Sequence, residues 1–141
     1  MAFIRKQGKT KLMWLPMTIT NAVGVDHLVA FSSGRLIEAA SSTASYSIVG
    51  VLRHAITSAS DEYTTAADVE VEVPVEKNVV WEADVTSGLV VADVGLYVDL
   101  TDGDHINRGA TTYDIATCVK VISTTKGWFI LNIGADAKEK A

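Results

Sequence analysis

The sequence predicts an all-β fold, an antiparallel barrel or sandwich, from three observations. Valine, isoleucine and threonine supply 42 of the 141 residues, and β-branched side chains fit a pleated sheet better than a helix. About eight short apolar segments are separated by turn residues every eight to twelve positions or so, as in antiparallel barrels and sandwiches. The length suits a single domain that folds without a metal ion or a disulfide.

Composition divides the chain into three parts. Residues 1–20 are predicted to form an extended N-terminal arm, either disordered or ordered by a partner, because this segment is basic and lacks apolar periodicity. Residues 21–135 form the single compact β-domain. Residues 136–141 are small or charged and are expected to be a flexible tail. No internal repeat or linker suggests a second domain.

The arm ends in an apolar run, residues 12–17, which is expected to dock on a partner or to plug the core. Pro16 excludes a continuing helix or a central strand there. The next elements are a hairpin, residues 28–31 and 35–39, whose loop contains Gly34. A strand follows at residues 47–54, where Gly50 suggests a bulge or a close approach of another backbone segment.

A helical turn and an alternating strand occupy the middle of the chain. Residues 60–67 favour one helical turn with Ser60 as the N-cap. Residues 69–75 alternate between valines and a polar set of Glu70, Glu72 and Pro74. Because Pro74 lacks an N–H and the glutamates repel each other, this strand is predicted to lie at a sheet edge.

The second half of the sequence predicts five further strands, at residues 79–85, 89–92, 95–100, 113–122 and 127–133. An Asp-Gly pair at residues 102–103 predicts a tight turn.

Charge is distributed unevenly along the chain. The net charge is −5, but residues 61–104 contain twelve acidic residues and a single base, Lys77. Such a surface repels a phosphate backbone, so nucleic acid is not an expected partner. No apolar stretch approaches the roughly 20 residues that cross a bilayer, and no secretory signal is visible, so no membrane partner is expected.

Metal sites are not expected. His27, His54 and His105 belong to no ligand motif, and the single Cys118 excludes an intramolecular disulfide or a cysteine-rich zinc site. The acids around the Asp-Gly pair, Asp99, Asp102 and Asp104, lack the spacing of a calcium loop and favour a turn with solvated carboxylates.

Catalytic residues are not expected either, and no cofactor is implied. The sequence has no nucleophile elbow, phosphate loop or dinucleotide fingerprint. Glu82 and Asp84 share one face of a predicted strand, but a solvated acidic face produces the same spacing. Cys118 is expected to be buried. All three tryptophans are expected to pack in the core, with Trp14 the best candidate among them for an interface anchor.

The order of features resembles the capsid decoration proteins, also called cement or head-stabilising proteins, of tailed bacteriophages. These features are the basic and apolar arm, the hairpin at 28–39, Ile-Val-Gly-Val at 48–51, the acidic valine-rich strand, Val-Gly-Leu-Tyr-Val-Asp-Leu-Thr-Asp-Gly at 94–103 and the closing Gly-Trp-Phe-Ile-Leu at 127–131. The resemblance implies a β-barrel or β-tulip-like domain, made in the host cytoplasm and bound to the outside of the virion capsid. It also implies a homo-oligomer, with a trimer favoured.

In the family that the chain resembles, the N-terminal arm runs onto the major capsid protein. The candidate contact residues here are Phe3, Ile4, Arg5, Lys6, Lys9, Lys11 and Trp14. The chain is therefore expected to be a structural protein that stabilises the capsid by bridging neighbouring subunits. Deletion of residues 1–16 is expected to leave the β-domain folded.

Two other classes of function remain open at this point. A carbohydrate- or ligand-binding β-module would use exposed aromatic residues such as Tyr97 or Trp81 as a stacking platform. An enzyme such as a trimeric all-β nucleotide hydrolase is not expected, because the glycine- and aspartate-rich nucleotide motifs are missing.

Overall fold

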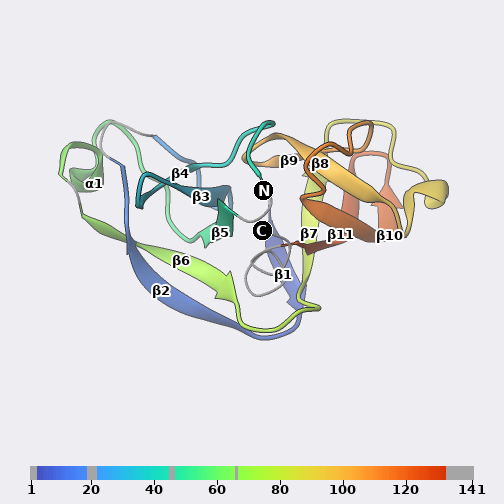
Figure 1. Cartoon of the computed structure of the whole chain (residues 1–141), viewed down its shortest axis with the longest axis horizontal. Helices are drawn as coiled ribbons and strands as arrows, with labels where there is room; N and C mark the ends of the chain where they lie inside the picture. Colours follow the sequence, from blue (N-terminus) through green and yellow to red (C-terminus); the bar gives the residue numbers. More distant parts are fainter. Residues whose placement is uncertain (1–2, 19–21, 45–46, 66, 133–141) are drawn as a thin grey trace.

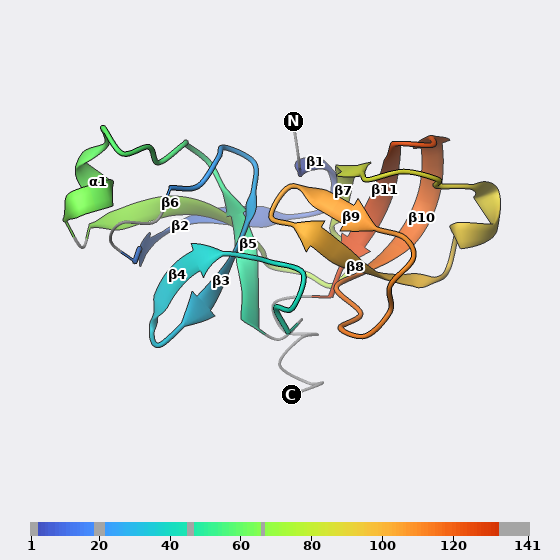
Figure 2. The same cartoon turned by 90° about the horizontal axis from the view of Figure 1, so that it is seen from above.

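The computed structural model describes residues 3–18, 22–44, 47–65 and 67–132, and it is almost entirely β (Figure 1). The strands form two lobes that lie side by side (Figures 1 and 2). The all-β prediction is confirmed. The predicted tail at 136–141 lies outside the described residues.

The barrel lobe is a small closed barrel. Its strands are β7 (Val80–Val85), β11 (Lys126–Leu131), β10 (Ala116–Ser123), β8 (Tyr97–Asp102) and β9 (His105–Asn107), in that order. A parallel pairing of β9 with β7 closes the ring. An additional strand, β1 (Ile4–Gln7), pairs with the first half of β7, at Val80 to Glu82, while β9 takes the second half.

The sheet lobe is a five-stranded antiparallel sheet with a helical turn, α1 (Asp61–Thr64), at its outer end (Figure 1). Its order is β2 (Thr10–Pro16), β6 (Asp68–Pro74), β5 (Ile48–Leu52), β3 (Leu28–Ser32) and β4 (Arg35–Glu38). The hairpin of β3 and β4 matches the prediction, with Gly34 at a φ of +82°. Ser60 is the N-cap of α1, but its side chain makes no cap hydrogen bond.

Two hydrophobic cores share the central strands. The larger core fills the barrel and extends to the sheet lobe, whereas the smaller core lies within the sheet lobe. In β3, Leu28 and Ala30 belong to the larger core and Val29 to the smaller one. Because this strand is buried on both faces, the two lobes form one folding unit rather than two independent domains.

Two predicted strands are corrected by the structure. Strand β6 is not at an edge, because β2 pairs along its whole length and leaves Glu72 only 8% exposed. The alternation itself is correct, since Val69 and Val71 face the smaller core. Residues 89–92 do not form a strand but enter a 3-10 turn, η2 (Val91–Asp93), where the buried carboxylate of Asp93 accepts a hydrogen bond from the Val90 N–H.

The N-terminal arm is extended, as predicted, but it does not project from the domain. Residues 4–16 contribute strands β1 and β2 to the two lobes, and Phe3 is completely buried in the larger core. Pairing within the chain satisfies the backbone groups that a free arm would leave to solvent or to a partner. We call residues 3–16 the N-terminal ribbon.

Candidate functional site

The N-terminal ribbon is tied to both lobes by ion pairs. In the sheet lobe, Glu72 accepts hydrogen bonds from Arg5 Nε (2.9 Å) and Thr10 Oγ1 (2.7 Å), and Arg53 Nη1 lies 3.4 Å from it. In the barrel lobe, Lys6 Nζ lies 3.7 Å from a carboxylate oxygen of Glu82. These contacts explain how a glutamate can be buried in β6 without leaving an uncompensated charge.

The outer edge of β2 is open over most of its length. Lys9 C=O accepts from the Val75 N–H and the Met17 N–H donates to Ala67, so odd-numbered residues direct their backbone groups toward β6. The even-numbered residues Leu12 and Trp14 therefore direct theirs outward. Within the described residues no strand pairs with them, because β2 is the terminal strand of its sheet and meets β4 only at the bridge between Met17 and Leu36.

Side chains at this open edge are apolar and basic. Leu12 and Trp14 are 57% and 61% exposed and share one face of the strand. Lys9 and Lys11 precede them along the ribbon and are also exposed, with their odd positions on the other face of the strand. An exposed hydrophobic edge strand is a template for pairing with another chain, so this edge is a candidate binding surface.

The predicted contact residues thus fall into three groups. Phe3 cannot contact a partner, because it is a core residue, and Ile4 is partly buried. Arg5 and Lys6 are exposed but engaged with Glu72 and Glu82. The members that remain available on the surface are Lys9, Lys11 and Trp14. All three tryptophans were predicted to pack in the core, but only Trp81 does. Trp14 is exposed, and Trp128 is partly buried, with its Nε1 donating to Glu82.

A second candidate surface was not anticipated from the sequence. The loop that contains η2 forms the outer end of the barrel lobe, on the side away from the sheet lobe (Figure 1). It exposes an apolar set that we call the barrel-tip patch: Val90, Val91, Val94, Leu96, Tyr97 and the adjacent Val119 of β10. Among its members only Tyr97 is a candidate exposed residue from the sequence; the valines and the leucine lie in apolar runs that predict strands.

Asp93 and Arg108 hold the loop beneath the barrel-tip patch. Arg108 donates from Nε and Nη2 to the two carboxylate oxygens of Asp93, each at 3.0 Å. The carboxylate is 4% exposed, and hydrogen bonds from Arg108 and from the Val90 N–H lower the pKa of Asp93. The patch is therefore presented by a fixed loop.

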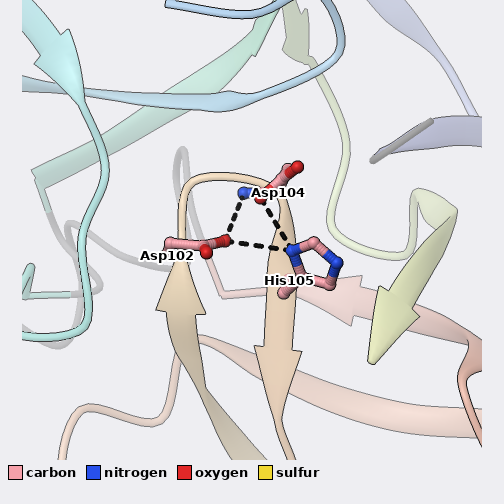
Figure 3. A group of neighbouring side chains, drawn as sticks. All are labelled: Asp102, Asp104 and His105. Carbon is pink, nitrogen blue, oxygen red and sulfur yellow. Dashed lines mark hydrogen bonds and ion pairs between the residues drawn. The ribbon is translucent and has the colours of Figure 1, made fainter. Parts of the chain in front are cut away.

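A cluster of two carboxylates and an imidazole lies at the predicted Asp-Gly turn, between β8 and β9 (Figure 3). Nδ1 of His105 lies 2.8 Å from Asp104 and 3.2 Å from Asp102. Burial alone would lower the pKa of His105, but its hydrogen bonds to the carboxylates of Asp104 and Asp102, and their negative charge, raise it. One possible metal-ligand atom from each of Asp102, Asp104 and His105 lies within 4.8 Å of the others. In this structure these residues already bond to one another through Nδ1 of His105.

The same turn joins the two lobes. Nε2 of His27, in the segment before β3, lies 3.4 Å from Asp104, and Nδ1 of His27 lies 2.7 Å from Glu38. The Leu28 N–H donates to the Gly103 carbonyl at 2.8 Å. A side chain at Gly103 would displace the Glu38 carboxylate and so disturb its contact with His27. The sequence alone gave no indication that His27 and His105 share a partner.

The other residues singled out from the sequence have structural partners. Glu82 and Asp84 share one face, as predicted, with Lys126 3.9 and 4.0 Å from them. Trp81 is fully buried, which excludes it as a stacking platform, whereas Tyr97 is 47% exposed. Cys118 is buried, as predicted, and burial raises the pKa of its thiol.

Within the described residues, no helix is long and apolar enough to span a membrane. The sequence matches no protein-family model and no curated protein sequence.

Proposed function

We propose that the chain is a bacteriophage capsid decoration protein that binds the outer surface of the expanded capsid through the open edge of β2. The observation that carries this proposal is the edge itself, where Leu12 and Trp14 present exposed side chains together with outward-facing backbone groups. The resemblance in the order of sequence features supplies the identity of the partner, the major capsid protein.

The edge of β2 has the chemistry of a strand-addition site. A partner strand would gain main-chain hydrogen bonds from Leu12 and Trp14 and would cover their side chains. Trp14 is of the residue type most enriched among the hot spots of interfaces. Lys9 and Lys11 add positive charge, which suits an acidic region of a capsid subunit.

The rest of the molecule suits a position on the outside of a particle. Residues 61–104 carry twelve acids, of which Glu72, Asp93 and Asp99 are buried, and the others keep the solvent-facing surface soluble. The two lobes share a core, so the chain can transmit force between two subunits as one rigid body. Many equivalent copies on a symmetric shell would also let modest individual contacts sum.

Quantitative mass spectrometry of purified virions, from the phage that encodes the chain, tests whether the chain is a component of the capsid. The number of copies relative to the major capsid protein should be a simple fraction of the lattice sites. A few copies per particle would indicate a tail or fibre component, and complete absence from the virion would reject the proposal.

A binding assay on expanded capsids that lack the chain tests the mechanism. Trp14→Thr replaces the indole with a β-branched residue that suits a strand and should weaken binding about thirtyfold, the effect of losing a hot spot of ~2 kcal/mol. Phe31→Thr is the matched control, because Phe31 is an aromatic residue on β3 of the same sheet and is 43% exposed. Equal binding by the two variants would contradict a role for the β2 edge.

A further inference from the structure

We infer that the barrel-tip patch is the surface through which two copies of this chain pair face to face. The inference does not depend on the proposed function, because the patch and the edge of β2 lie in different lobes (Figure 1). It rests on the extent of the patch, on the rigidity of the loop that carries it and on the local distribution of charge.

The patch is large for a surface that faces solvent. Val91 is 78% exposed and Leu96 is 54% exposed, and the other four members are between 36% and 47% exposed. Together they offer on the order of 500 Å² of apolar surface, which is near the upper end for the largest patch of a monomer. A standard interface buries roughly 800 Å² on each partner, so this patch with a polar rim is sufficient for a dimer.

The loop is organised before any partner binds. The Gly95 N–H donates to the Cys118 carbonyl at 2.7 Å, and the Cys118 N–H donates to Leu96 at 3.2 Å, so the loop is fixed to β10. The bidentate contact between Arg108 and Asp93 fixes its other side. A partner that binds a fixed apolar loop loses little conformational entropy on association.

The charge pattern favours a second copy as the partner. The chain carries a net charge of −5, so most faces of two copies repel each other. Asp93 is the only acidic or basic residue in positions 89–97, and it is neutralised by Arg108. Lys120, next to Val119, lies over the Trp128 ring, 4.6 Å from its centroid. The six residues of the patch are uncharged and Asp93 is paired, so two copies can meet there without opposing the acidic charges that dominate the chain; Lys120 is the charged group beside the patch.

A patch that meets its own copy is related by a two-fold axis, and the expected product is a dimer. This arrangement uses one patch per chain, whereas a ring of three chains would need a second, complementary patch. It also leaves the open edge of β2 in each copy accessible, because β2 belongs to the sheet lobe (Figure 2).

Sedimentation equilibrium of the full chain tests the inference, at concentrations up to about 100 µM, where interfaces of micromolar affinity are occupied. The wild-type chain should sediment as a dimer. Val91→Glu should be monomeric, with at least a tenfold weaker self-association, because it places a negative charge on the two-fold interface. Val25→Glu is the control, since Val25 is an exposed valine (43%) outside the patch, and it should remain dimeric.

Opposite charges at the same position sharpen the test. Val91→Lys alone should also be monomeric, but an equimolar mixture of Val91→Lys and Val91→Glu should recover a mixed dimer. Circular dichroism confirms that each variant is folded. A monomeric wild-type chain, a trimeric wild-type chain or a dimeric Val91→Glu variant would each overturn the inference.

Discussion

Individual side chains decide which part of the N-terminal ribbon is structural and which part is available to a partner. Phe3 is fully buried in the larger core, whereas Trp14 is 61% exposed. Gly8, at a φ of +96°, lies between the two, where the ribbon passes from β1 to β2. Both are aromatic residues in a basic segment, and composition does not distinguish them. The difference arises because Phe3 reaches the space between the lobes, where its N–H also donates to the Asp26 carbonyl at 2.9 Å.

Phe3→Ala should lower the free energy of unfolding by about 3–5 kcal/mol, the usual cost of truncating a buried phenylalanine. Urea denaturation followed by circular dichroism measures this difference. Phe31→Ala removes an aromatic ring that is 43% exposed, and it should cost clearly less. Equal losses in the two variants would mean that Phe3 is not a core residue.

His105 should give the stability of the chain a dependence on pH. Its pKa is raised in the folded state above the ordinary value of 6.5, so the folded state binds the proton more tightly than the unfolded state. The resulting stabilisation is fully present below about pH 6.5 and is lost as the pH rises through the raised pKa.

Thermal unfolding of the wild-type chain and of His105→Asn across this range measures the effect. The advantage of the wild-type chain over the variant should shrink as the pH rises from about 6 to 8. A constant difference would show that the contacts of His105 with Asp102 and Asp104 do not depend on its charge.

At the scale of elements, the pairing of β5 with β6 depends on the absence of a side chain at Gly50. A Cβ atom there would lie 2.2 Å from the backbone carbonyl oxygen of Glu72. The close backbone approach that the sequence predicted at this glycine is confirmed. Because the obstructing atom belongs to a paired strand, it cannot move aside without disturbing the sheet.

Gly50→Ala should therefore destabilise the chain by about 1–3 kcal/mol, the usual cost of overpacking. Gly109→Ala is the matched control, since the nearest atom to its added Cβ would be 3.5 Å away. Chemical denaturation compares the two variants. If Gly109→Ala lowered the free energy of unfolding as much as Gly50→Ala does, the loss would come from replacing any glycine with alanine and not from the contact between Gly50 and Glu72.

Local sequence patterns predicted where the strands and turns lie better than they predicted which strands pair with one another. The β3–β4 hairpin, β6 and the Asp-Gly turn were predictable because alternation and turn residues are properties of adjacent positions. The prediction that β6 lies at an edge was wrong because β2 pairs with it. Strand β2 was not recognised in the sequence, since it combines lysines with Leu12 and Trp14 and lacks an alternating pattern. The strand at 89–92 was wrong because Asp93 and Arg108, 15 positions apart, fix a turn there.

The candidate site was predictable to a similar degree. Trp14, Lys9 and Lys11 were identified from their types and positions, and they are exposed on one ribbon. The barrel-tip patch was missed, because valine and leucine at an exposed loop look the same in sequence as valine and leucine in a core.

At the scale of the whole molecule, the ribbon belongs to the fold rather than to a separate arm. Deletion of residues 1–16 removes an edge strand from each lobe, takes Phe3 out of the larger core and leaves Glu72 without Arg5 and Thr10. We therefore no longer expect the β-domain to remain folded after this deletion, as the sequence alone suggested. The truncated chain should lose its cooperative thermal transition, which differential scanning calorimetry would detect. A truncated chain that unfolds at the same temperature as the full chain would restore the free-arm interpretation.

The path of the ribbon also bears on how the chain acquires its structure. Strand β1 pairs with β7 and strand β2 pairs with β6, so the ribbon leaves the ribosome well before its partner strands are synthesised. Pairing between such distant segments is slow, because a long loop must close before any contact forms. Nascent chains on neighbouring ribosomes would expose Leu12 and Trp14 together, and we expect exchange of ribbons between them to be one route to misfolding.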